Sequence, residues 1–213
     1  MPDNMSRGLF GALSLGLAVV LAGCANLTDI KANLQKKSPC CKSFDELTYV
    51  ALPAKDPYPV QLGDHSPVFE FDVGKSYFTA LELPHASAGR QLQMYSMATG
   101  STAFEVATLA QIFCPRVLFL DARKAVIRAE EQLPRYDVFK GFGALRRGAG
   151  SEARVPEGAR YAVVHSNPAR YGEFVYRYDG PSGYMVGATY VREAGGALPF
   201  PCAPVADALV RLQ

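Results

Sequence analysis

The sequence predicts a mainly β protein: an antiparallel β-sandwich, jelly-roll-like, with one or two short helices. Short segments in which apolar and polar residues alternate recur along the 213 residues, a pattern typical of strands with one buried face. Pro, Gly, Asp and Asn separate these segments, in a chain with 19 Gly and 15 Pro. No segment of similar length carries a convincing 3.6-residue repeat. Two packed sheets that bury their apolar faces against each other account for this pattern.

The first 23 residues are expected to be a lipoprotein signal peptide. An uncharged apolar stretch, residues 9–22, follows Arg7 and ends in small residues, as in a secretory signal. This stretch is too short to span a bilayer comfortably as a permanent helix. The residues Leu21-Ala22-Gly23-Cys24 resemble the lipobox of bacterial lipoproteins. That resemblance implies cleavage before Cys24 and lipidation of this residue with palmitate-type acyl chains.

An acylated Cys24 implies a place in the cell envelope. Two or more acyl chains hold a protein stably on a membrane, because each buried CH₂ contributes roughly 0.8 kcal/mol. Ala25 stands where many inner-membrane lipoproteins have Asp, so the resemblance implies an outer-membrane lipid anchor that faces the periplasm. We expect residues 24–39 to form a lipidated tether, with room for a short helix, and residues 40–213 to form a single β-sandwich domain.

Seven segments of the mature chain predict strands. In residues 68–73, for example, Phe69 and Phe71 share one face while Glu70 and Asp72 share the other. The seven segments are residues 68–73, 77–83, 91–97, 116–120, 160–165, 173–178 and 184–191. A hairpin-like loop, residues 179–183, is expected to join the last two strands.

Two stretches are candidates for the short helices. Residues 122–132 have helical propensity, although a strand through Ala125-Val126-Ile127 is equally allowed. Ser166-Asn167-Pro168 places a capping residue before a proline and predicts one helical turn through Tyr171. Residues 140–158 lack periodicity and hold many Gly and Arg, so we expect a long exposed loop there.

Four cysteines remain after Cys24, and their even number favours disulfides in an oxidising compartment. They are Cys40, Cys41, Cys114 and Cys202. A Cys40–Cys41 bridge needs a strained eight-membered ring, so we expect each of these two residues to pair with Cys114 or Cys202. A zinc site is the alternative, but adjacent cysteines lack the usual two-residue spacing and no histidine lies near them. No metal site is therefore predicted.

The sequence contains no recognisable catalytic set. It has no Gly-x-Ser-x-Gly turn, no phosphate-binding loop and no dinucleotide fingerprint, so no cofactor is predicted. Its three histidines, His65, His85 and His165, lie far apart in loop or strand-end positions. A net charge of +2, from 22 basic and 20 acidic residues, provides no argument for binding nucleic acid.

Tyrosines gather in the C-terminal third and suggest a ligand surface. β-Sandwiches often carry carbohydrate on an aromatic platform, and the amphipathic tyrosine ring suits such a surface. The candidate ligand-binding residues are Tyr171, Tyr176, Tyr178, Tyr184 and Tyr190. The alternative is that these rings pack a sandwich face, which is the commoner role of tyrosine at alternate strand positions.

Five stretches within residues 40–172 carry a family resemblance. They are Cys40–Leu47 (CCKSFDEL), Ser66–Phe71 (SPVFEF), Gly74–Phe78 (GKSYF), Leu81–Pro84 (LELP) and Tyr161–Gly172 (YAVVHSNPARYG). Together they resemble the maltose operon periplasmic protein family, the MalM-like lipoproteins. The resemblance implies a periplasm-facing lipoprotein of β-sandwich type, linked to carbohydrate or envelope polysaccharide, with no catalytic residues to carry over. Residues 201–204 and the arginine-rich segment near Arg146 match the family less well.

The sequence therefore predicts a non-catalytic envelope lipoprotein that binds carbohydrate or polysaccharide, or supports carbohydrate transport. Its expected partners are the lipid bilayer, through Cys24, and a carbohydrate or an envelope protein. One alternative is a structural or assembly lipoprotein that docks on an envelope protein complex through an exposed strand edge or residues 140–158. A second alternative is a hydrolase that uses an unrecognised Asp or Glu with a histidine. A deep pocket enclosing a histidine beside a carboxylate would favour that alternative.

Overall fold

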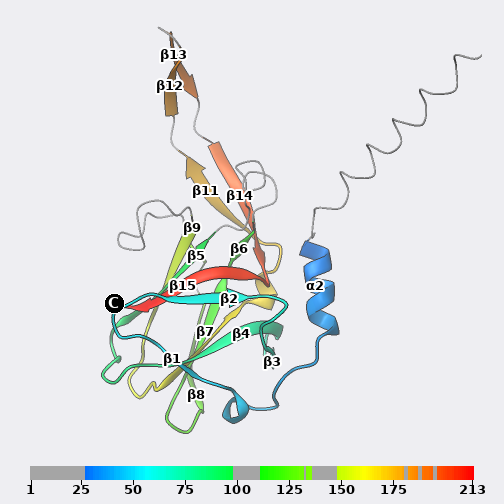
Figure 1. Ribbon diagram of the computed structural model, residues 1–213, viewed down its shortest axis with the longest axis vertical. Coiled ribbons are helices and arrows are strands. Elements are labelled where there is room, and N and C mark those ends of the chain that lie inside the picture. Colours follow the sequence, from blue (N-terminus) through cyan, green and yellow to red (C-terminus); the bar gives the residue numbers. More distant parts are fainter. Residues whose placement is uncertain are drawn as a thin grey trace, which may run out of the picture.

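The protein is mainly β, as the sequence predicts, and its strands form several sheets (Figure 1). The computed structural model describes residues 27–97, 111–131, 133–135, 148–179, 182–186, 189–193 and 196–213. Two sheets make up the sandwich, and strand pairing within each is antiparallel except for the short parallel pair β1–β4.

The first sheet has six strands in the order β1-β4-β10-β7-β8, with β3 paired to β4. Its strands are β1 (Val50–Ala51), β3 (Val68–Phe71), β4 (Gly74–Glu82), β7 (Pro115–Leu120), β8 (Val126–Glu131) and β10 (Tyr161–Ser166). The second sheet has four strands in the order β2-β15-β5-β9. Its strands are β2 (Tyr58–Leu62), β5 (Gln91–Met97), β9 (Gly148–Arg154) and β15 (Ala206–Leu212).

The main core fills the space between these two sheets. Leu81 and Phe119 of the first sheet and Leu92 and Val210 of the second belong to one cluster of fully buried side chains. Along β15 buried and half-buried residues alternate, as expected for a strand with one face on the core.

A second core covers the outer face of the six-stranded sheet. Phe69, Phe71 and Phe78 form edge-to-face and tilted ring pairs there, and the segment 41–49 with the 3₁₀ turn η1 (Phe44–Glu46) packs over them. Strands β4, β7 and β10 are therefore buried on both faces. This double burial explains the consecutive apolar residues in β7 (VLFL) and β10 (YAVV).

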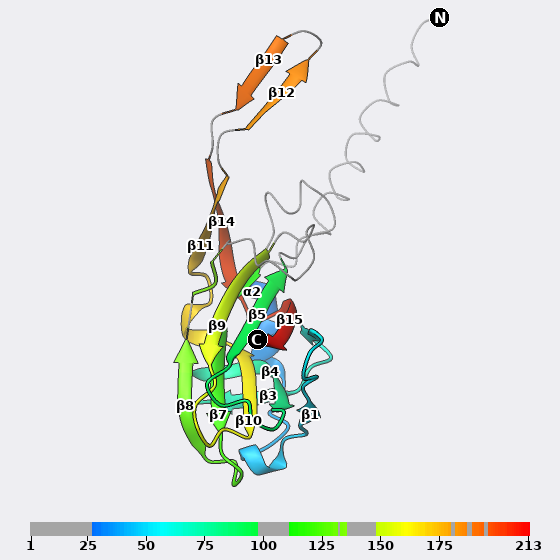
Figure 2. The ribbon, with the colours of Figure 1, turned by 90° about the vertical axis from the view of Figure 1, so that its left-hand side faces the viewer.

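A two-stranded arm projects from the sandwich along the longest axis of the molecule (Figure 2). In the arm β11 (Phe174–Asp179) pairs with β14 (Gly196–Ala203), and beyond them β12 (Ser182–Val186) pairs with β13 (Thr189–Glu193). The lower end of β14 also pairs in parallel with β6 (Ile112–Phe113). We call residues 174–203 the arm.

Most of the predicted strands are confirmed, but the predicted hairpin is wrong. Strand β11 pairs with β14, and residues 184–191 fall in two strands, β12 and β13, that pair with each other. Gly187 supplies a second turn signal, and local patterns do not specify which strand becomes the partner. The stretch 122–132 contains strand β8, and the helical turn predicted after Ser166 is the 3₁₀ turn η2 (Pro168–Arg170), capped by the Asn167 side chain.

The predicted exposed loop at residues 140–158 is also wrong in its second half. Residues 148–154 form β9, which pairs along its whole length with β5. Its alternate residues Ala149, Ser151 and Ala153 are buried. These side chains are small, so they produce almost no hydrophobic periodicity in the sequence although they fit a close approach of two strands.

The folded part begins earlier than predicted. Helix α2 (Leu27–Lys36) lies within the segment interpreted as a tether, and its Leu34 is fully buried in the main core. Lys75 Nζ also donates to the carbonyl oxygens of Gln35 and Lys37 at 3.0 Å. Part of the predicted tether is therefore packed on the sandwich. The predicted signal peptide and Cys24 lie outside the described residues, among which no helix is long and apolar enough to cross a membrane.

Candidate functional site

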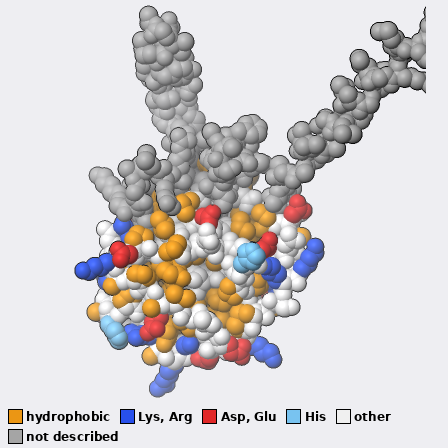
Figure 3. All heavy atoms as spheres, in the orientation of Figure 1, with side chains coloured by type: hydrophobic (Ala, Val, Ile, Leu, Met, Phe, Trp, Pro, Cys, Tyr) orange, Lys and Arg blue, Asp and Glu red, His pale blue; other side chains and the backbone are white. Residues whose placement is uncertain are grey.

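Two adjoining hollows lie on the open side of the sandwich, where β2 forms the edge of one sheet and β1 the edge of the other. The turn between β2 and β3 separates them, and Gln61, His65 and Ser66 line both. Figure 3 shows hydrophobic side chains gathered near the centre of one face of the molecule and charged side chains mostly around its rim.

The larger hollow has a volume of about 420 Å³, within the range of small-ligand sites. Its apolar wall comes from the Cys40–Cys41 disulfide, Val50, Pro59, Val60, Pro67, Phe78 and Ala80. Its polar groups come from Thr48, Tyr58, Gln61, His65, Ser66 and Thr79. No Asp, Glu, Lys or Arg is among these lining residues, so the hollow presents hydrogen-bonding groups beside apolar surface without a fixed charge.

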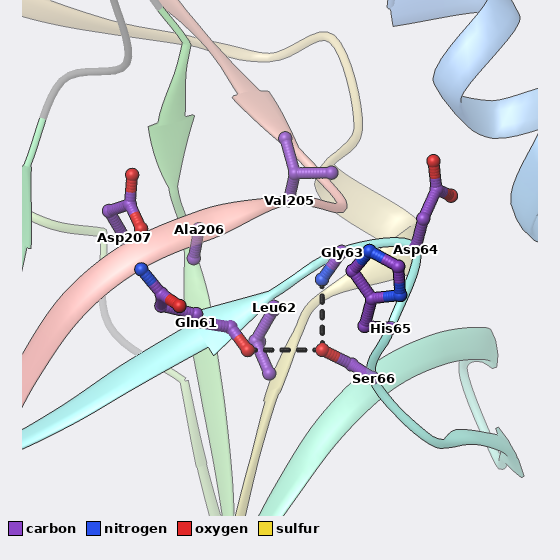
Figure 4. Close-up of a pocket in the computed structure, with 9 residues that line it drawn as sticks. All are labelled: Gln61, Leu62, Gly63, Asp64, His65, Ser66, Val205, Ala206 and Asp207. Carbon is purple, nitrogen blue, oxygen red and sulfur yellow. Dashed lines mark hydrogen bonds between the residues drawn. The ribbon is translucent and has the colours of Figure 1, made fainter.

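The smaller hollow, of about 190 Å³, adds carboxylates to this surface. In Figure 4 Gln61 and Asp207 stand at one end, His65 and Asp64 at the other, and Leu62, Val205 and Ala206 lie between them. The two carboxylates come from different parts of the chain, Asp64 from the turn after β2 and Asp207 from β15. The antiparallel pairing of β15 with β2 places Asp207 directly opposite Gln61.

Hydrogen bonds close the backbone of the turn from which Asp64 and His65 project. Ser66 Oγ donates to the carbonyl oxygen of Gln61 at 3.0 Å and accepts from the Gly63 amide at 3.0 Å (Figure 4). The Ser66 amide also donates to the carbonyl oxygen of Gly63 at 2.9 Å. The turn is thus closed by three bonds, which preorganises Asp64 and His65 between the hollows.

Asp64 is already engaged by two neighbours. The Tyr77 hydroxyl donates to Asp64 Oδ1 at 3.1 Å, and Lys37 Nζ lies 3.6 Å from the same oxygen and donates to the Asp64 carbonyl. Burial, together with the Asp64 carboxylate, raises the pKa of Tyr77 to about 12, so this hydroxyl stays protonated and remains a donor. Asp64 therefore acts first as an anchor of the turn.

The three histidines have different surroundings. His65 is exposed and lines both hollows, and within the described part of the chain it forms no hydrogen bond with Asp64 or Asp207. His85 is also exposed, and its Nδ1 lies 3.1 Å from Nη1 of Arg160. Of the three histidines, His65 is the one that lines either of these two hollows, and it shares the smaller one with carboxylates.

His165 is fully buried on β10. Its ring stacks on Phe71 at a centroid distance of 3.8 Å, and Nδ1 lies 2.9 Å from the carbonyl oxygen of Ser166. Burial, with the nearby Arg116 guanidinium, lowers the pKa of His165 to about 4. Arg116 in turn forms a bidentate pair with Asp72. A neutral imidazole stacked on a core phenylalanine is a packing residue and lines neither hollow.

The four predicted disulfide cysteines do form disulfides, but the expected pairing is wrong. Cys40 pairs with Cys41, and Cys114 pairs with Cys202. Cys41 packs against the second core and the Cys40 amide donates to the Val68 carbonyl, whereas Cys114 and Cys202 are both buried in a third cluster at the base of the arm. The two pairs occupy different places in the fold, so the folded chain does not allow the long-range pairings that the sequence suggested.

The structure describes the side chains of two of the five candidate tyrosines, Tyr171 and Tyr176. Tyr171 is partly buried and packs against the main core, and its hydroxyl lies 3.1 Å from Ser76 Oγ. Burial raises the pKa of Tyr171 to about 12. Tyr176 is half exposed on β11 beside Phe174. The side chains of Tyr178, Tyr184 and Tyr190 lie outside the described residues.

The described residues form no metal site, and the comparisons with known proteins found no match. Among the residues described, no group of three or more His, Cys, Asp or Glu could hold a metal ion. No protein-family model, no curated protein and no solved structure matches the chain. The residues around the hollows, such as Gln61 and Asp207, carry no motif, and only the pairing of β2 with β15 brings them together.

Proposed function

We propose that this protein is a lipid-anchored protein of the bacterial envelope, facing the periplasm, that binds a neutral carbohydrate without transforming it. The observation that carries the proposal is the larger hollow, which is lined by six polar side chains together with apolar ones and by no Asp, Glu, Lys or Arg. A sugar ring has the same character, because its C–H faces are apolar and its hydroxyl groups both donate and accept hydrogen bonds.

Several features support an oligosaccharide as the ligand in preference to a monosaccharide. The two hollows lie on either side of one turn and share Gln61, His65 and Ser66 in their linings, so an extended ligand that crosses the turn would contact both. Carboxylates such as Asp207 accept hydrogen bonds from hydroxyl groups without demanding a charged ligand. The lipobox at Cys24 and the resemblance of residues 40–172 to the MalM-like lipoproteins point toward the same setting, an envelope polysaccharide or a transported oligosaccharide.

The test is calorimetric titration of the oxidised protein with neutral oligosaccharides, beginning with malto-oligosaccharides and glucans of increasing length. We expect affinity to rise until both hollows are filled. Gln61→Ala is expected to weaken binding about tenfold, the usual effect of losing one or two hydrogen bonds. The matched control is Gln35→Ala, since Gln35 is likewise an exposed glutamine but lies on α2. Equal affinities for the two variants, or no binding across the panel, would refute the proposal.

The hydrolase alternative has one observation in its favour, since His65 shares the smaller hollow with Asp64 and Asp207. Against it, Asp64 is held by Tyr77 and Lys37, and the 190 Å³ hollow is small for a substrate with its attacking water. The alternative predicts that the protein shortens one of the oligosaccharides and that His65→Ala abolishes the cleavage. Chromatography of the titration mixtures after prolonged incubation decides between the two.

A further inference from the structure

The larger hollow has a disulfide in its wall. Cys40 and Cys41 both line it, and their sulfur atoms are bonded to each other. Cys40 is exposed and Cys41 is half-buried. The polar groups of this hollow suit the hydroxyls of a sugar, and the C–H face of the sugar ring needs an apolar partner with accessible surface.

The aromatic rings of the hollow are largely used in packing, although an exposed aromatic ring is the usual platform for a sugar. Tyr58 and Phe78 are the aromatic lining residues. Phe78 has 3% of its surface exposed and belongs to the second core, and Tyr58 packs against the main core. The accessible apolar wall therefore comes mainly from the disulfide, together with Val50, Pro59 and Pro67.

The disulfide has the properties of such a platform. A bridge between adjacent residues closes an eight-membered ring that includes their peptide bond, so the two side chains have few conformations to lose when a ligand contacts them. Divalent sulfur is polarisable and gains dispersion energy from close contact with C–H groups. It has no hydrogen to donate within a disulfide and is a weak acceptor, so it loses little when water leaves it.

The backbone on both sides of the ring is fixed. The Cys40 amide donates to the Val68 carbonyl on β3 at 2.8 Å, and the Lys42 amide donates to Glu46 Oε2 at 2.8 Å. Cys41 also packs against the second core. The disulfide is therefore held beside the six-stranded sheet, in a defined place in the wall of the hollow.

We propose that the Cys40–Cys41 disulfide is a ligand-binding group of the larger hollow, on which one C–H face of a sugar ring lies. Polar lining residues such as Gln61 and Thr79 then bind the hydroxyl groups. This inference rests on the proposed function, because its ligand is the same neutral oligosaccharide. Two separate thiols rotate independently and present no single surface, so the hollow binds its ligand in an oxidising compartment and loses affinity on reduction.

The second disulfide provides an internal control for reduction. Cys114 and Cys202 have 1% and 0% of their surfaces exposed, whereas Cys40 is exposed. Because access controls the rate of disulfide reduction, a water-soluble phosphine should reduce Cys40–Cys41 first. The phosphine supplies two electrons and takes the oxygen atom of one water molecule, whose two protons convert the sulfurs into thiols.

The first test measures affinity in the full chain with Cys24→Ser, in which the two disulfides contain all remaining cysteines. The probe is the malto-oligosaccharide or glucan of the titration panel that binds most tightly. Cys40→Ser with Cys41→Ser should lower its affinity about tenfold, because the contact surface is no longer preorganised. Lys42→Ser is the matched control, since Lys42 is exposed in the same segment but does not line the hollow, and it should change affinity less than about twofold. Selective reduction of the intact bridge should reproduce the loss, which provides the measurement if the serine pair disturbs folding.

The second test asks whether the ligand touches the disulfide. With ligand at about ten times its Kd, roughly nine-tenths of the protein is bound, so reduction of Cys40–Cys41 should slow about tenfold. The rate for Cys114–Cys202 should stay the same. Mass spectrometry of the alkylated cysteine peptides follows both rates.

The outcomes separate this inference from the proposed function. Equal affinity of the chains with and without the Cys40–Cys41 bridge overturns this inference alone. A loss of affinity without protection from reduction assigns the disulfide a purely structural role and also overturns it. Absence of binding by the chain with both disulfides intact, across the whole panel, refutes the proposed function and this inference with it.

Discussion

Acidification should destabilise this protein through His165. The residue has 0% of its surface exposed, stacks on Phe71, and has a pKa lowered from 6.5 to about 4. The unfolded chain therefore binds the proton more tightly than the folded one. Stability from this group is complete above pH 6.5, declines as the pH falls from 6.5 toward 4, and is lost below pH 4. A tenfold difference in proton affinity is about 1.4 kcal/mol, so the full loss is roughly 3 kcal/mol.

The neighbouring ion pair contributes in a different pH window. The hydrogen bond from Arg116 lowers the pKa of Asp72 below its ordinary 3.8, so the stability that this carboxylate contributes is present above pH 3.8 and lost below it. Asp72 is largely exposed, so its contribution is small. The decline between pH 6.5 and pH 4 therefore belongs mainly to the imidazole.

The assay is urea unfolding of the oxidised protein, followed by far-ultraviolet circular dichroism from pH 7 to pH 4. His165→Phe keeps an aromatic ring against Phe71 and removes the proton site, so its free energy of unfolding should change about 3 kcal/mol less over this range than that of the wild type. His165→Gln serves if the larger ring disturbs folding. The control is His85→Phe, at an exposed position. An unchanged pH dependence in both His165 variants would refute the reasoning.

Three further predictions concern the core, the disulfide and a tyrosine. Leu34→Ala should cost about 3 kcal/mol in urea unfolding, because Leu34 is fully buried, and an effect below 1 kcal/mol would show that α2 is not part of the folded unit. Replacing both Cys114 and Cys202 by Ala should cost up to about 4.5 kcal/mol, since their bridge spans 88 residues. Tyr171→Phe should cost about 1 kcal/mol through loss of the hydrogen bond to Ser76 and leave oligosaccharide affinity unchanged in calorimetry.

Much of the sandwich is predictable from local patterns. Strands such as β3, β5 and β10 carry several large apolar residues at regular positions, and the proline after Asn167 marks the 3₁₀ turn. Strand β9 escapes prediction because Ala149, Ser151 and Ala153 are small, and its burial depends on the neighbouring strand β5. The same holds for Leu34, whose burial depends on distant strands and not on the helix that contains it.

The candidate site could not be predicted from the sequence. The sequence identifies the four disulfide cysteines as a set. It does not show which cysteine pairs with which, because one bridge joins adjacent residues and the other joins residues 88 positions apart. Gln61 and Asp207 are nearly 150 positions apart and belong to no motif, so they become neighbours only through the pairing of β2 with β15. Tyr171 packs against the main core, in line with the commoner role of a tyrosine beside strands.

By itself the sequence determined the mainly β class of this protein, because alternation of apolar and polar residues is a local property of a strand with one face on a core. It also determined where a lipid anchor is expected. Only the tertiary structure decided the pairing of strands and cysteines, the hollows beside β2 and the attachment of the arm through the Cys114–Cys202 disulfide. These features depend on contacts between residues far apart in the chain, and such contacts are selected by the packing of the whole core.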